Sequence, residues 1–180
     1  EVERDVPSDA LYMTFHMARR MDKRFYLADM LSDVLSRGKS SRFTKRLVLE
    51  KHLFSELDAF LLGSSDAGLF VVSGKPKEGV SLEEAYSEVR LELEILQKEL
   101  VTEHELQKIK NKKESINVFG EMSVLNKAMN LCSFELLGDA QMINQQMDNY
   151  TSITPRDLQE EAMEIFKEEN CSVLFYKARK

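Results

Sequence analysis

Hydrophobic and polar residues alternate one by one in two parts of the chain, and a period of two predicts β-strands. The first run covers residues 11–17 and has apolar residues on both faces, as expected of a central strand. The second covers residues 56–62, where Leu57, Ala59 and Leu61 share one face, opposite Glu56, Asp58 and Phe60.

The segment after the second run predicts a β-hairpin. Residues 63–68 are rich in Gly and Ser, which favour turns, and the apolar residues 69–72 would form the returning strand. Residues 74–79 are predicted to form a loop, and residues 171–176 a final strand.

Elsewhere apolar residues recur every three or four positions, which is the spacing of an amphipathic helix. Helices are predicted to begin after Asp22, Ser81, Thr102 and Thr154, whose side chains can cap a helix N-terminus. Gly38 lies where the first of these helices should end. The helix at 81–100 and the one at 102–116 follow each other directly, so an αα-hairpin is expected.

A shorter helix is predicted between these larger elements, capped by Ser40 and ending near Lys51. Phe43 and Leu47 would face inward. The basic side chains of the same helix are expected to be mostly in water: Arg42, Lys45 and Arg46.

The element order is strand, two helices, two strands, several helices and a last strand. We therefore predict an α+β fold, with an antiparallel or mixed sheet covered by helices on one face. Residues 1–9 are polar and are expected to be the remnant of an interdomain linker, because the chain starts without Met and resembles a piece of a longer protein. Residues 10–180 are expected to form a single domain.

Composition narrows the functional classes. The net charge is −6 and basic residues are dispersed, so nucleic-acid binding is disfavoured. No apolar run is long enough for a membrane-spanning helix. The methionines, such as Met13, Met17, Met21 and Met30, are expected to fill an irregular core or an interface, and a Met-rich surface that binds a protein is an alternative.

Residue chemistry indicates no active site. Neither His-Glu-x-x-His nor His-x-x-Glu-His occurs, and His16, His52 and His104 are expected to be solvated or packed. Cys132 and Cys171 are predicted to be reduced packing residues.

Other candidate chemistries are also weak. Gly38-Lys39-Ser40 lacks the upstream glycine of a phosphate loop, and Ser40-Ser41 lacks a strained Gly-x-Ser-x-Gly turn. The abundant carboxylates at 83–105 and 157–169 are expected on solvated helix faces. We therefore assign no catalytic and no metal-binding residue to this chain, and no substrate-binding residue is identified.

An ordered set of short motifs resembles the second homologous domain of pitrilysin/insulinase zinc metallopeptidases, the family of the mitochondrial processing peptidase. The motifs span nearly the whole chain: the Gly-x-Ser-Ser-Arg run at 38–47, Glu-x-x-Leu at 50–53, Gly-Leu-Phe at 68–70, Thr-x-x-Glu-Leu at 102–110 and Ile-Thr-x-x-Asp-Leu-Gln at 153–159.

The resemblance implies a supporting role. In that family one domain carries His-x-x-Glu-His, and the opposite domain supplies an Arg and a Tyr seven residues apart that bind substrate. The corresponding positions here are Val48 and Ser55, which cannot replace a guanidinium and a phenol. We therefore expect no cofactor in this chain, and zinc in the N-terminal domain of its parent protein.

Two functions follow from the resemblance. The first is the non-catalytic C-terminal domain of a zinc metalloendopeptidase, which closes a chamber that degrades peptides and packs against the zinc-bearing domain or a homologous subunit. The second is a domain of an inactive structural or assembly subunit of the same family, like the core proteins of respiratory complexes.

Overall fold

The computed structural model describes residues 1–179, and within them five strands form one mixed sheet in the order β1-β5-β2-β4-β3. The strands are β1 (Val2–Arg4), β2 (Ala10–Met17), β3 (Phe54–Leu62), β4 (Gly68–Pro76) and β5 (Cys171–Ala178). Only β1 runs parallel to its neighbour, β5, and the remaining pairs are antiparallel. The predicted α+β fold class is confirmed.

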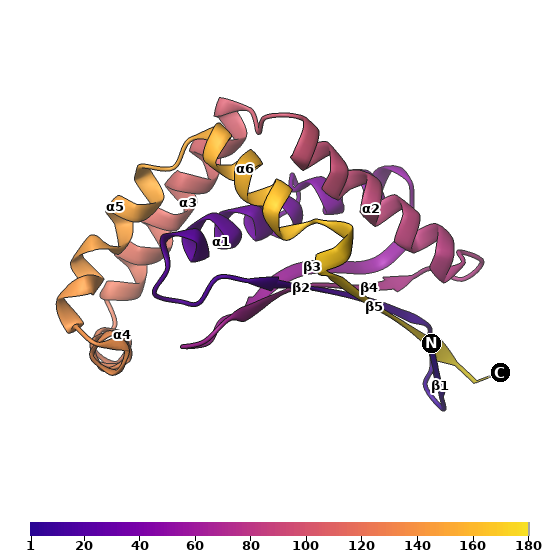
Figure 1. Cartoon of the computed structure of the whole chain (residues 1–180), viewed down its shortest axis with the longest axis horizontal. Helices are drawn as coiled ribbons and strands as arrows, with labels where there is room; N and C mark the ends of the chain where they lie inside the picture. Colours follow the sequence, from indigo (N-terminus) through magenta and orange to yellow (C-terminus); the bar gives the residue numbers. More distant parts are fainter. Residues whose placement is uncertain (180) are drawn as a thin grey trace.

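The helical segments gather on one side of this sheet (Figure 1). They are α1 (Lys23–Ser36), η1 (Phe43–Glu50), α2 (Leu82–Lys98), α3 (Glu103–Glu121), α4 (Val124–Leu137), η2 (Ala140–Gln145), α5 (Gln146–Thr151), α6 (Pro155–Ile165) and η3 (Glu168–Asn170). In the described part of the chain, none of them covers the opposite face of the sheet (Figure 1).

The core lies between the helices and the inward face of the sheet. Phe166, just after α6, is fully buried and meets Phe15 of β2 and Phe70 of β4 edge to face, with ring centroids 5.3 and 5.1 Å apart. The alternation predicted for β3 is confirmed, since Leu57 and Ala59 are buried while Asp58 is exposed. Met13, Met17 and Met30 belong to this core, as predicted.

Capping side chains begin the main helices where the sequence predicted them. Asp22 accepts the backbone N–H of Arg24, and Ser81 accepts that of Glu84. Thr102 and Thr154 each form a complete capping box, with Pro155 in the first turn of α6. Each bond satisfies a backbone donor that the helix itself leaves free.

The short helix after Gly38 differs from its prediction. Its bonding is π-helical, and Ser40 does not cap it. Ser41 instead bonds the carbonyl of Gly38 and the hydroxyl of Thr44, at 2.7 and 2.9 Å, and bends the chain into η1. Gly38 has a φ of +99°, which suits its predicted place after α1.

The predicted αα-hairpin is wrong. Helices α2 and α3 spread from residues 99–102 towards opposite ends of the sheet (Figure 1). Helix α2 packs on α6 and η1, whereas α3 packs on α1, α4 and α5. The prediction rested on the adjacency of the two helices in sequence, but their apolar faces pack against different elements.

The predicted loop at 74–79 is also partly wrong, because β4 continues to Pro76. Gly74 is needed there for close packing rather than for a turn, since a Cβ atom at this position would lie 2.7 Å from the Phe54 ring. At the other edge of the sheet, Val2–Arg4 pair with Tyr176–Ala178. The division of the chain at residue 9 stays a prediction.

Candidate functional site

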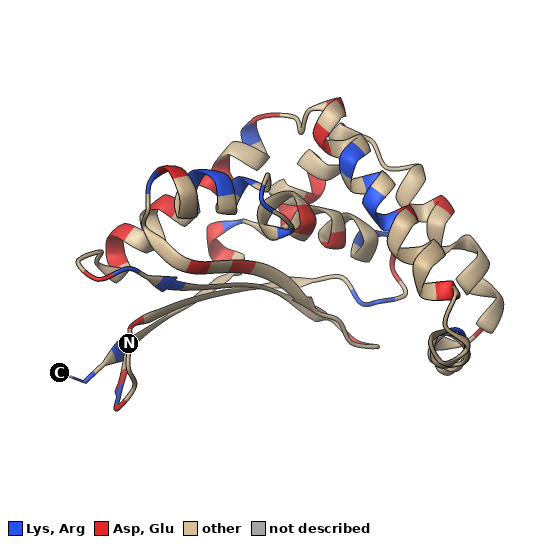
Figure 2. Ribbon diagram, turned by 180° about the vertical axis from the view of Figure 1, so that it is seen from behind, with Lys and Arg blue, Asp and Glu red and all other residues tan. Residues whose placement is uncertain are grey.

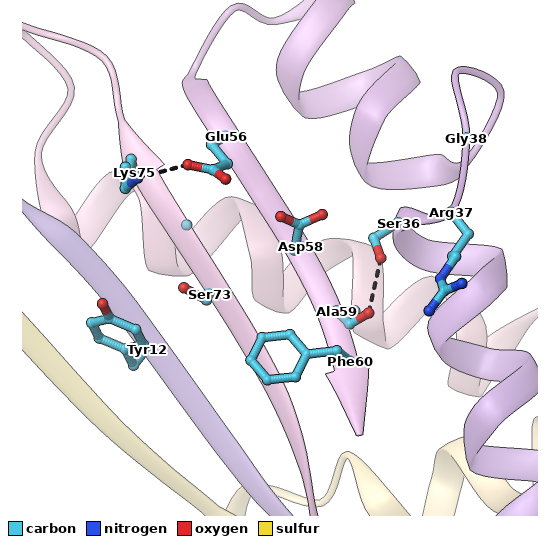
Figure 3. A pocket seen from close by; sticks show the side chains of 11 residues that line it. Tyr12, Ser36, Arg37, Gly38, Glu56, Asp58, Ala59, Phe60, Ser73 and Lys75 are labelled. Atoms are coloured by element: carbon cyan, nitrogen blue, oxygen red, sulfur yellow. Dashed lines mark hydrogen bonds and ion pairs between the residues drawn. The ribbon is translucent and has the colours of Figure 1, made fainter. Parts of the chain in front are cut away.

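The uncovered face of the sheet carries a groove of about 560 Å³ near the β3 edge (Figure 3). The alternation of β3 places Glu56, Asp58 and Phe60 on this face, opposite the core. Ala59 of β3, strands β2 and β4, the end of α1 and the bend after it complete the lining, with Tyr12, Ser36, Arg37, Gly38, Ser73, Gly74 and Lys75.

Charged and aromatic side chains share this groove. The ammonium of Lys75 lies 2.7 Å from the carboxylate of Glu56, a hydrogen bond that raises the pKa of Lys75. Tyr12 and Phe60 are exposed by 37% and 40%. The surface therefore offers one exposed ion pair, the carboxylate of Asp58, the guanidinium of Arg37 and two aromatic rings to a bound molecule.

A hydrogen bond holds the edge strand beside the groove. The hydroxyl of Ser36, at the end of α1, donates to the carbonyl oxygen of Ala59 at 2.9 Å (Figure 3). Since Ala59 lies on β3, the bond fixes the edge strand against α1. The strands and the end of α1 thus set most of the shape of the groove, and the bend at Arg37 and Gly38 completes it.

Neither Val48 nor Ser55 lines the groove. Val48 is half-buried on η1 and packs against the core. Ser55 begins the exposed part of β3 beside a β-bulge, and its hydroxyl donates to the carbonyl of Lys75 at 3.1 Å. The two side chains therefore have structural contacts in this domain.

The histidines are not brought together. His16 is exposed on β2, His52 follows η1 with a φ of +56°, and His104 is exposed in the first turn of α3. Within residues 1–179, no group of three or more His, Cys, Asp or Glu side chains could hold a metal ion. None of the helices described is long and apolar enough to cross a membrane.

The cysteines are both free thiols, but they differ in packing. Cys171 is half-buried against the core, as predicted, and burial raises its pKa. Cys132 is exposed on α4. The prediction that both cysteines are packing residues is therefore wrong for Cys132 in the described structure.

The expectation that the basic side chains of η1 are solvated is wrong for Arg42. Its side chain is 9% exposed and forms two bonds of 3.2 Å with the carboxylate of Glu105 on α3. Arg46 is 41% exposed, but it lies 2.9 Å from Glu92, a buried carboxylate of α2. The arginines of the Gly-x-Ser-Ser-Arg run thus attach η1 to both long helices.

Sequence reasoning missed these pairs because each partner is far along the chain. A local signal existed for Glu92, which stands between Val89 and Leu93 on the buried side of α2. Burial raises the pKa of Glu92, and Arg46 only partly opposes that rise. A carboxylate at an apolar helix position requires a cation from another element.

A third polar cluster joins α1, α3 and α5. The ammonium of Lys113 lies 2.5 Å from Asp29 and 2.9 Å from Asp33, and it is 13% exposed. The hydroxyl of Tyr150 donates to Asp29 at 2.5 Å, and burial, with the charge of Asp29, raises its pKa. These contacts connect the three helices.

Solved structures with the same fold come from several proteins. A protease from Helicobacter pylori has a TM-score of 0.93 at 24% identity, over 98% of this chain and 43% of its own. The inactive peptidase domain of a proposed zinc protease from Bordetella parapertussis has a TM-score of 0.87 at 18% identity, over 99% and 95%. A chain of complex III2 from Candida albicans has a TM-score of 0.81 at 13% identity, over 97% and 44%.

Sequence comparison gives the family. No curated protein matches the chain. The chain spans less than half the length of the Helicobacter pylori protease. The sequence profile of the peptidase M16 inactive domain matches residues 1–113, which is more than half of the chain, and the chain belongs to this family.

Proposed function

We propose that the chain is the non-catalytic C-terminal domain of a zinc metalloendopeptidase. It would close a chamber that degrades peptides and pack against the zinc-bearing domain or a homologous subunit. Residues 10–180 would form the domain, and residues 1–9 would lead into it from a linker. Zinc would be held by the other domain of the parent protein.

One observation carries this proposal: the sheet has helices on a single face, and its other face holds a groove (Figures 1 and 3). A chamber wall must present shape and charge to an unfolded peptide, and it needs no nucleophile or metal ligand of its own. Extended peptides add to exposed sheet edges or dock in grooves lined by aromatic rings. Phe60 and Tyr12 line this groove, which lies near the edge strand β3.

The experiment uses the full-length parent protein. Purified protein should contain zinc, and it should cleave an unfolded peptide in a reaction that a chelator stops. Phe60→Ser should raise KM for the peptide and leave the zinc content unchanged. Leu49→Ser is the matched control, because Leu49 is 54% exposed on η1, outside the groove. A parent protein with no zinc and no cleavage would contradict the proposal.

A second candidate is an inactive structural or assembly subunit. The same fold in a chain of complex III2 favours it. The sequence of the parent protein upstream of Glu1 separates the two candidates. An intact His-x-x-Glu-His there supports the peptidase, and a degenerate version supports the structural subunit.

A further inference from the structure

Helix α4 and the end of α3 form an apolar surface with little contact to the rest of the fold. Only Phe134 is buried among the residues of α4. Neighbouring apolar side chains are largely in water, and we call the following set the α3–α4 face: Val118, Phe119, Met122, Leu125, Met129 and Leu136. Phe119, Leu125 and Leu136 are exposed by 70%, 68% and 90%.

This surface is poor in charge. Residues 116–137 contain only Glu121, Lys127 and Glu135 as charged residues, whereas 31% of the whole chain is charged. The contrast with α2 is visible in Figure 2. A helix with apolar residues on every side is normally buried, and the centres of protein interfaces are depleted of charge. The composition of α4 is therefore that of a covered helix.

The α3–α4 face also has a hollow beside it. Leu131, Cys132, Glu135, Leu136 and Ala140 line an open depression of about 730 Å³. Its only charged group is engaged, because the carboxylate of Glu135 accepts the backbone N–H of Ala140 at 3.2 Å. The remaining lining suits an apolar side chain that projects from a partner.

Resting on the proposed function, we propose that the other half of the parent protein, the zinc-bearing domain, covers the α3–α4 face with an apolar, charge-poor surface. The Helicobacter pylori protease matches 98% of this chain at a TM-score of 0.93, yet more than half of that protein lies outside the match. A domain tethered in the same chain has a high effective concentration. Such a domain would cover the α3–α4 face at all times. A peptide substrate would cover it only while bound, and a second copy of the protein would dissociate from it on dilution.

The reactivity of Cys132 measures whether the α3–α4 face is covered, because its exposed thiol lines the hollow beside that face. The experiment labels the full-length parent protein with a maleimide and locates the label by peptide mass spectrometry. The same protein unfolded in urea gives the rate for a free thiol. We expect Cys132 to react at least about tenfold more slowly in the native protein than in urea.

Two variants test the origin of this protection. Leu125→Asp combined with Leu136→Asp should raise the labelling rate of Cys132, since carboxylates on the face oppose an apolar contact. Leu49→Asp is the control and should leave the rate unchanged, because Leu49 is exposed on η1. If the double variant fails to fold, the labelling rate of the native protein still decides.

Each other outcome overturns the proposal. A native rate equal to the rate in urea means an uncovered face. Protection that disappears on dilution to a monomer, checked by light scattering, assigns the face to a second copy. Protection that appears only with added peptide assigns it to the substrate. Zinc content and peptide cleavage are measured separately, so failure of the proposed function is distinguished from failure of this docking surface.

Discussion

Arg42 and Glu105 form a two-bonded ion pair although 63 positions separate them in the sequence. The same carboxylate accepts the backbone N–H of Thr102 at 3.2 Å and closes the capping box of α3. Burial alone would raise the pKa of Glu105, but the bonds and charge of Arg42, together with Thr102, outweigh burial and lower it. One carboxylate therefore starts a helix and fixes it to η1.

Arg42→Ala should lower the free energy of unfolding by about 2 kcal/mol at neutral pH. Breaking a fully buried ion pair costs more stability than this. Here the cost is smaller, because Glu105 is 25% exposed and keeps its bonds to Thr102. Because the pKa of Glu105 is lowered, the pair stabilises the fold above the ordinary pKa of 4.5 and loses its effect as the pH falls. Urea unfolding measures the change. Arg156→Ala, in an exposed pair, is the control and should cost under about 0.5 kcal/mol.

Glu92→Gln and Glu94→Gln should respond to pH with opposite signs. The raised pKa of Glu92 means that its contribution to stability is full below 4.5 and is lost as the pH rises. Relative to the native protein, Glu92→Gln should therefore gain stability between about pH 4 and pH 7. The pKa of Glu94 is lowered by its bond to Lys98, so Glu94→Gln should lose relative stability over that range. Urea unfolding of both variants and of the native protein at about pH 4 and about pH 7 checks this. The prediction is refuted if the free energy of unfolding changes equally with pH in both variants.

Leu47→Asp should destabilise the fold by at least about 3 kcal/mol, because it places an unpaired charge in the core. Leu47 is fully buried, whereas Leu49 on the same segment is 54% exposed. Leu49→Asp should therefore change the free energy of unfolding by under about 0.5 kcal/mol. Thermal or urea unfolding compares the pair, and similar effects of both substitutions would contradict the orientation of η1.

Lys113→Ala should cost about 3 kcal/mol, because it removes the cation that Asp29 and Asp33 share and leaves Asp33 only its longer pair with Arg37, at 3.5 Å. Tyr150→Phe removes a single bond to Asp29 and should cost about 1 kcal/mol. The double variant should cost less than the sum, since both side chains bond the same carboxylate. Urea unfolding of the three variants tests this coupling, and strict additivity would argue against a shared cluster.

The purified 180-residue chain should bind no stoichiometric zinc and should show no chelator-sensitive peptide cleavage. The described residues contain no cluster of His, Cys, Asp or Glu suited to a metal. Metal analysis and a peptide assay are the measurements. A full equivalent of zinc would contradict the assignment of metal binding to another domain.

Much of the fold follows from local signals. The capping residues Asp22, Thr102 and Thr154 begin their helices because each satisfies a donor within its own first turn. The alternation of β3 fixes which face is buried, because adjacent side chains of a strand point to opposite sides. These outcomes depend on residues a few positions apart.

The groove could be anticipated only in part. The alternation of β3 predicted that Glu56, Asp58 and Phe60 share a face. Their assembly with Tyr12 and Lys75 depends on strand order, which no local pattern contains.

The sequence alone determined the class of fold, the main helix starts, the buried side of β3 and the absence of a zinc motif. Tertiary structure decided the partners: Arg42 with Glu105, Arg46 with Glu92, α2 with α6 rather than with α3, and α4 left in water. The physical reason is distance along the chain. Caps and strand alternation act over one turn or one pleat. Whether a charged side chain on a helix becomes buried depends on which distant element packs against it.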